Sequence, residues 1–591
     1  MENAAKNRTW PLVVVALAFG IATAIGVKSR YASIIDTAWI FALYTGAAVA
    51  LLIGILKFTS WFCTTKGEGG EACPGLKAGE ACPEGGEARP EASETCPEGG
   101  EACPGSQSQA VPERKKAASL FAAHKTFLIL FGIAVIPFLL MLLANYPGVG
   151  SADSGDSIRQ SLGEVSLSNH TTFFYTCLVM PFIKFGNAIG NVPFGFFLYA
   201  LCQCVCMAAV VAFTANWFLR KGAPRKVVLA VFCFYVLNPV ILRFGITMWK
   251  DIPFSIAVLL YVLTLADAAF SKGELFQNKK AIVRLAVFTF LVAMLRGNGT
   301  IVVALSTIAL LIAYKDKARK VFACVGVSVV LLSVLITGPL YTVLGVSPSP
   351  FQESVGILLQ QVGYVINNNG EVSESALDTF SQIMEIEYWE SDYDTRTADG
   401  LKFGGHFNEE WLNDNKIAFL GAWFETGLHN VPQYVKAWLA NTQGYWDVSP
   451  NAADRWVCMD GVSTFDDETG TNLLSQLTGL SVLESDFSDY SELRGLPFLY
   501  PFFNLACMFW IALSIAALWL CRKKGRFAVI TVPLLAVWLT LMIAAPDFCQ
   551  FRYMFSFHMC LPVLLALACY DFWKPAGAIK PGAISPHLPS S

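Results

Sequence analysis

The segment from Tyr146 to Thr172 combines several reactive side chains directly after a long apolar stretch. It contains two aspartates three residues apart, Asp153 and Asp156, followed by Gln160. A carboxylate can remove a proton from an acceptor hydroxyl as a general base, or it can hold a divalent metal ion. Asp153 and Asp156 are therefore the candidate catalytic residues of the chain.

The spacing in this segment predicts a helix that begins near Asp153 and lies on the membrane surface. Asp153, Asp156 and Gln160 stand at i, i+3 and i+7 and share one face, whereas Ile158 and Leu162 lie on the opposite, apolar face. An aspartate at the start of a helix also serves as its cap. One aspartate of the pair is expected to be the cap and the other to be functional, and the spacing is compatible with either assignment.

The composition indicates the class of protein that holds this segment. The chain has 591 residues, of which 54% are hydrophobic and 15% are charged, and its net charge is -3. Soluble domains do not reach this hydrophobic content, and so small a net charge does not favour nucleic acid as a partner. We expect a multi-pass membrane protein in contact with the lipid bilayer.

The apolar stretches predict an all-α polytopic fold. A helix needs about 20 apolar residues to cross the bilayer, and about twelve stretches, between roughly eleven and thirteen, are candidates. One of them is Ala38–Phe58. Two shorter ones, Leu285–Leu295 and Thr300–Tyr314, flank Arg296 and are expected to form either two spans or one broken pair.

Basic residues predict the orientation of these helices. Lys and Arg cluster in alternate loops, such as residues 114–116, 315–320 and 522–526, and such an excess marks the cytoplasmic side. Both termini are therefore expected in the cytoplasm of a cell-membrane protein, and the first apolar stretch is interpreted as an uncleaved span rather than a signal peptide. The segment around Asp153 then faces outward.

The linker between the second and third predicted spans is rich in Cys, Gly, Pro and Glu, so we expect it to be disordered. Its cysteines are spaced too widely for a structural zinc site, and no metal ligand is assigned there. The predicted regions are two N-terminal transmembrane helices at 1–60, the cytoplasmic linker at 61–120, a transmembrane core at 121–345 with its outer loop at 146–193, an acidic extracytoplasmic domain at 346–495, and C-terminal transmembrane helices with a short cytoplasmic tail at 496–591.

The extracytoplasmic domain at 346–495 is strongly acidic and is expected to be mostly helical. It carries 24 Asp and Glu against 6 Lys and Arg. Its apolar spacing predicts two amphipathic helices that break near Asn430–Pro432. Its tryptophans either pack in a core or offer aromatic faces to sugar rings.

Further polar residues are predicted at the outer edge of the membrane. Lys250, Arg296 and Arg552 lie at ends or interruptions of apolar stretches, where ionisable groups are candidates for function. Three cations on one side suit an anionic phosphate group, which an arginine binds through two donors at once. Asp251 and Tyr553 stand beside two of these cations and are expected to position the substrate.

Taken in order, these patterns resemble the bacterial GT-C-type membrane glycosyltransferases, in a largely uncharacterised branch related to the polyprenyl-phosphate-sugar-dependent mannosyl and aminoarabinose transferases. The similarity extends from about Leu128 to Tyr570 and leaves out the cysteine-rich linker. The residues that carry the resemblance are Tyr146-Pro147-Gly148, Asp153-Ser154, Asn169-His170, Asn238-Pro239, Trp249-Lys250-Asp251, Arg296-Gly297-Asn298-Gly299 and Phe551-Arg552-Tyr553.

The resemblance implies a GT-C-like first outer loop and transfer of a sugar from a polyprenyl-phosphate-sugar donor to a cell-envelope acceptor, by an inverting displacement on the outer face. An aspartate in this loop would act as the base or hold a divalent cation such as Mg²⁺ or Mn²⁺. Asp153 matches that place, and Asp156 is close enough to share it. Gln160, Asn169 and His170 would position the substrate. The branch often has a second histidine after the Asn-His pair, but Thr171 follows His170 here, so His170 is expected to contact the acceptor or the carrier and not to be catalytic.

Two other classes of membrane protein share some of these features. A transporter or flippase of lipid-linked sugars also places charges in a membrane cavity, but it usually has internal repeats, which this sequence does not show. A scaffold would use the acidic domain to recruit a partner. An enzyme should lose sugar transfer when Asp153 and Asp156 become asparagine, whereas a scaffold should tolerate both changes.

Overall fold

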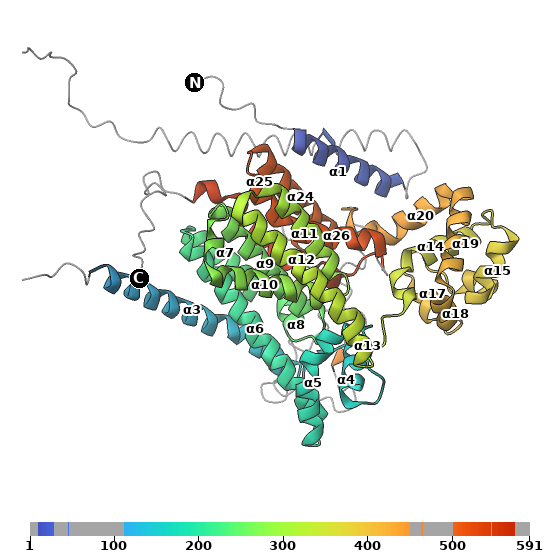
Figure 1. Ribbon diagram of the computed structural model, residues 1–591, viewed down its shortest axis with the longest axis horizontal. Helices are drawn as coiled ribbons and strands as arrows, with labels where there is room; N and C mark the ends of the chain where they lie inside the picture. Colours follow the sequence, from blue (N-terminus) through green and yellow to red (C-terminus); the bar gives the residue numbers. More distant parts are fainter. Residues whose placement is uncertain are drawn as a thin grey trace, which may run out of the picture.

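A computed structural model describes residues 10–28, 45–46, 111–448, 463–464, 500–544 and 547–573 of the chain. Nearly all of these residues lie in helices (Figure 1). The sheet within the described residues joins two short strands, β1 (Val149–Gly150) and β2 (Ser463–Thr464), in antiparallel register. The prediction of an all-α fold is confirmed.

Six helical segments in the described part of the chain are long and apolar enough to cross a membrane, which agrees with the predicted membrane-embedded protein. A seventh span results if the bent pair α7 (Arg225–Val236) and α8 (Pro239–Gly245) crosses as one unit. The six segments are His124–Ala144 in α3 (Val111–Ala144), α6 (Val192–Arg220), α9 (Asp251–Phe270), Asp316–Val343 with α12 (Asp316–Leu335), Gly525–Ala544 with α26 (Val532–Ala544), and Phe551–Ala568 with α27 (Phe555–Ala568).

The predicted number of about twelve spans is wrong for the described residues. The segments on either side of Arg296 form α10 (Lys279–Met294) and α11 (Gly299–Ala313), with 16 and 15 residues. Each is shorter than the roughly 20 residues that a full crossing needs, because the helix ends where the apolar run is interrupted. The predicted span Ala38–Phe58 lies almost entirely outside the described residues. Two other shorter apolar segments are Trp10–Thr23 within α1 (Trp10–Lys28) and α24 (Leu505–Cys521).

The predicted linker at 61–120 is described only at its end. Helix α3 begins at Val111, so the last residues of this region are helical and not disordered as predicted. The remainder of the linker, including its repeated cysteines, lies outside the described residues.

The bend between α7 and α8 has a local cause at Asn238-Pro239. Proline cannot donate a backbone hydrogen bond, and its ring disfavours a continuous helix, so the chain turns by 55° at this point. The Asn238 side chain caps α8 by accepting hydrogen bonds from the amides of Val240 and Ile241 at 3.0 and 3.3 Å. Its amide nitrogen lies 2.8 Å from Nε2 of His558 in α27. The bend therefore directs the α8–α9 connection toward α27.

Basic side chains gather at one end of the helix bundle. Lys221 and Arg284, at the end of α6 and the start of α10, both pair with Asp267 of α9, at 2.6 and 2.8 Å. Lys524 pairs with Asp571 just beyond α27. The opposite ends of α9, α10 and α27 carry Asp251, Arg296 and Arg552.

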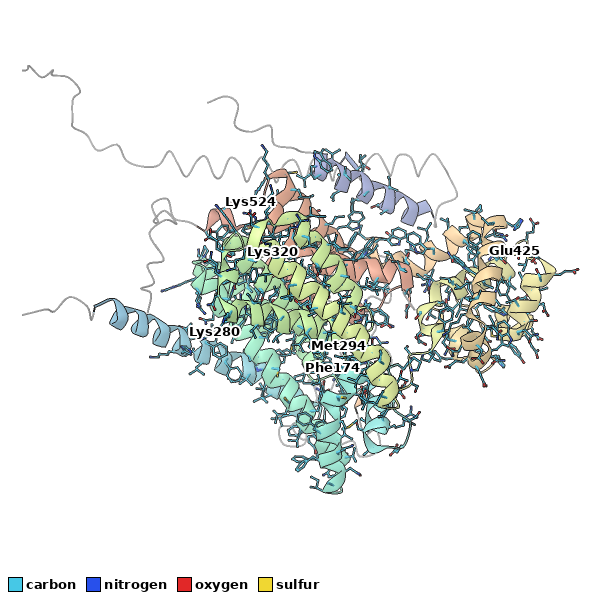
Figure 2. All side chains as sticks on the ribbon, in the orientation of Figure 1. Phe174, Lys280, Met294, Lys320, Glu425 and Lys524 are labelled. Carbon is cyan, nitrogen blue, oxygen red and sulfur yellow. The ribbon has the colours of Figure 1, made fainter. Side chains whose placement is uncertain are left out.

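Figure 2 shows the same division between the two ends of the bundle. Lys280, Lys320 and Lys524 lie toward one end, and Met294 and Phe174 lie toward the other. Helix α10 runs from the basic end to the end at which Met294 precedes Arg296. If the basic end is cytoplasmic, the Asp153 end is the outer one.

A small helical domain projects from the bundle at residues 346–448 (Figure 1). Its core is formed around buried aromatic residues such as Phe380, Trp389 and Phe419. As the apolar spacing predicts, a helix breaks at Asn430 and a second one follows. The main helices of this domain are α14 (Gly356–Asn367), α15 (Glu374–Ile383), α19 (Lys416–His429) and α20 (Val431–Thr442).

Candidate functional site

The predicted surface helix is present as α4 (Ala152–Leu162). The amide of Ser151 donates to Oγ of Ser154 at 3.0 Å, which secures the first turn, and the helix ends at Gly163 in a left-handed conformation with φ 78°. Ile158 on the apolar face packs into a cluster with Tyr175 and its neighbours. The apolar face of α4 therefore contacts neighbouring helices.

The segment before α4 is attached to the connection between α8 and α9. The amide of Val149 donates to the carbonyl of Ile246 at 3.2 Å, and the amide of Met248 donates to the carbonyl of Val149 at 2.9 Å. Oγ of Ser154 donates to the carbonyl of Met248 at 2.6 Å. These bonds hold α4 directly beside the residues that follow Met248, and so they set the position of Asp153 relative to Lys250.

Asp153 forms ion pairs with two cations from distant parts of the chain. Nζ of Lys250 lies 2.9 Å from Oδ2 of Asp153, and Nη1 of Arg552 lies 3.0 Å from the same oxygen. All three side chains are mostly buried, with 21%, 17% and 20% exposed for Asp153, Lys250 and Arg552. The guanidinium of Arg552 also lies over the rings of Trp249 and Tyr553, 5.2 and 5.0 Å from their centroids.

These contacts determine the protonation of Asp153. Burial alone would raise the pKa of its carboxyl, but the charges of Lys250 and Arg552 and the hydrogen bond from Lys250 outweigh that effect and hold the pKa well below its ordinary value. Asp153 is therefore a carboxylate at neutral pH.

A second ion pair lies behind the first. Nε of Arg296 is 3.2 Å from Oδ1 of Asp251, and these side chains are only 10% and 1% exposed. Nη1 of Arg296 donates to the backbone carbonyl of Tyr553 at 3.1 Å, and the Tyr553 hydroxyl accepts from Nη2 of Arg552 at 3.2 Å. Tyr553 thus links the two pairs. Arg296, predicted to bind phosphate, is held by Asp251 and does not reach Asp153.

The site retains unused hydrogen-bonding capacity. Among its described residues, Nδ1 of His170, Nε of Arg552 and Oδ2 of Asp251 are buried without a hydrogen-bond partner, and Oδ1 of Asp251 has only its ion pair with Arg296. Three cations face two carboxylates here, which leaves one net positive charge. Buried polar groups are normally satisfied, and an anionic ligand could accept a hydrogen bond from Nε of Arg552 and balance the positive charge. The Asp251 oxygens only accept, so a donor group and not an anion would satisfy them.

The structure separates Asp156 from Asp153. Asp156 forms an ion pair with Arg159 one turn along α4, and the two side chains are 31% and 55% exposed. Gln160 is buried, and its Oε1 accepts from the amide of Ser168 at 3.0 Å, which orders the loop after α4. Asp153, Asp156 and Gln160 thus have three different environments, although the sequence predicts one shared face.

Asn169 and His170 have different contacts in the structure. Oδ1 of Asn169 accepts from the amide of Phe173 at 3.0 Å, so this side chain caps the start of α5 (Phe173–Ala188). His170 lies near enough to Asp153 to contribute to the lowering of its pKa. Of the two residues, only His170 belongs to the surroundings of the carboxylate.

A family model matches residues 162–576, more than half of the chain. The chain belongs to this family of unknown function, DUF6020. No curated protein and no solved structure shows a significant match to it. The DUF6020 region includes Lys250, Asp251, Arg296 and Arg552, whereas Asp153 lies shortly before it.

The residues of this DUF6020 protein do not form a divalent-cation site around Asp153. No three His, Cys, Asp or Glu side chains come together within the described ranges, and the nearest charges to Asp153 are two cations, which repel Mg²⁺ or Mn²⁺. We therefore derive no step through a metal ion.

Trp249 and Ser154 belong to the motifs that carry the resemblance, but sequence reasoning gave them, and Ser151, no role in supporting Asp153. Trp249 donates from Nε1 to Oγ of Ser151 and lies beneath the guanidinium of Arg552. Ser151 is the N-cap of α4, so the expectation that one of the two aspartates caps this helix is wrong. Ser151 and Ser154 stand at the spacing of a capping box, which is the signal in the sequence for the start of this helix.

Proposed function

We propose that this protein is a membrane glycosyltransferase, which moves a sugar from a polyprenyl-phosphate donor to a cell-surface acceptor on the outer face of the membrane. The observation that carries the proposal is the partly buried carboxylate of Asp153 held by Lys250 and Arg552 at the end of the helix bundle. The carboxylate can accept the proton of the acceptor hydroxyl, and the two cations can bind the phosphate of the donor.

Lys250 and Arg552 are proposed to bind the phosphate of the donor. Both cations contact the same oxygen of Asp153, and Nε of Arg552 has no hydrogen-bond partner. A phosphate offers several acceptor oxygens and suits the planar fork of an arginine. When the phosphate draws these cations toward itself, Asp153 loses the charges that keep its pKa low, and its carboxylate becomes a stronger base.

The proposed reaction is a single displacement. Asp153 takes the proton from an acceptor hydroxyl as that oxygen attacks the anomeric carbon of the sugar. The bond between this carbon and the phosphate oxygen breaks, and its electron pair leaves with the polyprenyl phosphate, whose charge Lys250 and Arg552 stabilise. The products are an inverted glycoside, polyprenyl phosphate and a protonated Asp153, which returns its proton to water.

The orientation of the bundle supports an outer site. Lys221 and Arg284 pair with Asp267 at the far end of α9, and Lys524 pairs with Asp571 beyond the far end of α27. The other ends of α9 and α27 carry residues of the site. By the positive-inside rule the end with the basic residues faces the cytoplasm. The acceptor would then reach Asp153 from the cell-surface side.

The contacts favour Asp153 over Asp156 as the base. Asp156 pairs with a surface arginine of its own helix, whereas Asp153 faces the two cations. Only Asp153 contacts the cations that would bind the donor phosphate, so only its basicity should rise when the donor binds.

Mass spectrometry of surface glycans and glycolipids, from cells with and without the gene, tests the proposal. We expect one glycan species to lose a defined sugar in the deleted cells and to regain it with the intact gene. Unchanged glycans would contradict the transferase.

A further inference from the structure

Helix α19 carries an apolar stripe on its outer side. Ile417, Leu420, Phe424 and Leu428 stand at i, i+3, i+7 and i+11, and 87%, 39%, 60% and 63% of these residues is exposed. Phe419 points the other way, into the core of the domain. None of these four residues packs in the core of the domain, and large exposed apolar patches commonly mark contact surfaces.

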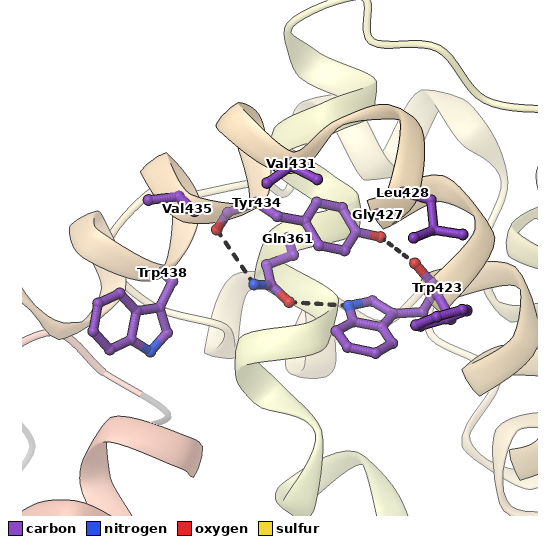
Figure 3. A pocket seen from close by; sticks show the side chains of 9 residues that line it. Gln361, Trp423, Gly427, Leu428, Val431, Tyr434, Val435 and Trp438 are labelled. Atoms are coloured by element: carbon purple, nitrogen blue, oxygen red, sulfur yellow. Dashed lines mark hydrogen bonds between the residues drawn. The ribbon is translucent and has the colours of Figure 1, made fainter.

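The stripe continues across a hollow between α19 and α20. The hollow has a volume of about 310 Å³ and is bordered by Leu428 and Val435 among others (Figure 3). Its polar groups bond to one another: Nε1 of Trp423 donates to Oε1 of Gln361 at 2.9 Å, and the Tyr434 hydroxyl donates to the Trp423 carbonyl at 2.7 Å. The hollow is therefore suited to an apolar ligand such as an acyl chain.

Trp438 connects this surface to the membrane-spanning bundle. It lines the first hollow and also a second one of about 620 Å³, formed with Trp510 of α24 and Trp538 of α26. Nε1 of Trp438 donates to the carbonyl of Met542 in α26 at 2.8 Å. The exposed face of α19 and α20 is thus continuous with the surface of a candidate span, and tryptophans concentrate at this junction as they do at membrane interfaces.

The charge of this stretch differs from that of its domain. Between Lys416 and Trp446 the sequence has one acidic residue, Glu425, whereas the region 346–495 has 24. Lys436 lies on the exposed part of α20. Anionic lipid headgroups would repel most of the domain, but they would not repel this face.

We propose that the exposed face of α19 and α20 inserts into the outer leaflet of the bilayer, with a phospholipid acyl chain in the hollow beside Trp423. This insertion fixes the small domain against the membrane beside α26. The inference does not depend on the glycosyltransferase function, since it concerns the position of the domain and not the reaction at Asp153.

Photo-crosslinking of the full chain tests this inference. A benzophenone amino acid replaces Phe424, and the purified protein is placed in vesicles that contain only phosphatidylethanolamine and phosphatidylglycerol. Asp378, exposed on α15 of the same domain, is the matched control position. Both positions are exposed, and elution as a single species in detergent confirms that each variant has folded.

We expect illumination to add the mass of one phospholipid at position 424 and none at position 378. A crosslinked dimer instead of a lipid adduct would overturn the proposal in favour of a contact between two copies of the chain. Equal lipid labelling at both positions, or none at either, would also overturn it. A polyprenyl donor cannot produce the adduct, because the vesicles contain none.

Discussion

Replacing Asp153 by asparagine removes the proposed base while preserving the shape of the site. The asparagine oxygen can still accept hydrogen bonds from Lys250 and Arg552, which donate to Oδ2 of Asp153 at 2.9 and 3.0 Å. What is lost is the negative charge and the ability to take a proton. The variant therefore separates chemistry from packing better than alanine would.

The magnitude of the effect follows from these contacts. General-base catalysis contributes about 10²–10⁴-fold to a rate, so sugar transfer by Asp153→Asn should fall by about this factor. Hydrogen bonds to charged groups contribute about 1.5–3 kcal/mol each. In the variant the bonds remain but the charge is lost, and the three side chains are about a fifth exposed. The free energy of unfolding should therefore fall by about 1–3 kcal/mol. Such a cost leaves most of the protein folded.

Asp156→Asn is the matched control, because it makes the same chemical change one turn along α4. Asp156 pairs only with the exposed Arg159, and exposed pairs of this kind contribute about 0.3–0.5 kcal/mol. Sugar transfer by this variant should stay within about twofold of the intact protein.

The assay quantifies the modified glycan by mass spectrometry in deleted cells that express either variant at equal membrane levels. A large loss with Asp153→Asn and almost none with Asp156→Asn is the expected result. Full activity of Asp153→Asn, or equal losses with both variants, would refute the assignment of Asp153 as the base.

Three further predictions follow from the same contacts. Lys250→Gln and Arg552→Gln should each raise the KM for the lipid-phosphate donor, with a loss of about 10–100-fold in kcat/KM, because each removes a charge-assisted bond to phosphate; an unchanged donor KM would exclude that role. The pKa of Asp153 in the free protein lies well below its ordinary value, so kcat/KM should not fall as the pH decreases from 7 to about 5. The rate constant kcat reports the donor-bound state, in which phosphate has drawn the cations away from Asp153, so kcat should begin to fall at a higher pH than kcat/KM does. If both begin to fall at the same pH, phosphate does not change the pKa of Asp153. Asn238→Ala should lower thermal stability in detergent by about 1–2 kcal/mol, because it removes the cap of α8 and the contact with His558; an unchanged melting temperature would show that the bend needs neither contact.

The local pattern of the sequence predicts the secondary structure around the site. The spacing after Asp153 predicts α4, and the interruption at Asn430 predicts the break between α19 and α20. These features depend on neighbours within a few turns, which is the range over which helical periodicity acts. The sequence predicts the interruption at Arg296, but the predicted number of spans is too high because the two apolar runs beside it form helices of 16 and 15 residues, shorter than a full crossing.

The arrangement of the side chains within the site depends on contacts that no spacing contains. Asp153 and Asp156 are equivalent in the sequence, and they differ because the chain returns 97 and 399 residues later with Lys250 and Arg552 beside only one of them. Likewise, Arg296 is one of three outward cations in the sequence, but Asp251 neutralises it in the fold. Contacts between residues far apart in the sequence therefore decide whether a side chain is available to a ligand or is already paired within the protein.

Reconstitution of the purified protein is the most direct test of the central claim. The protein is placed in vesicles with the polyprenyl-phosphate sugars and envelope acceptors extracted from the deleted cells, and mass spectrometry follows both lipid and acceptor. We predict that polyprenyl phosphate appears in step with the glycosylated acceptor, and that Asp153→Asn abolishes both. Movement of an intact lipid-linked sugar across the membrane without cleavage, or no change in any lipid, would contradict the account.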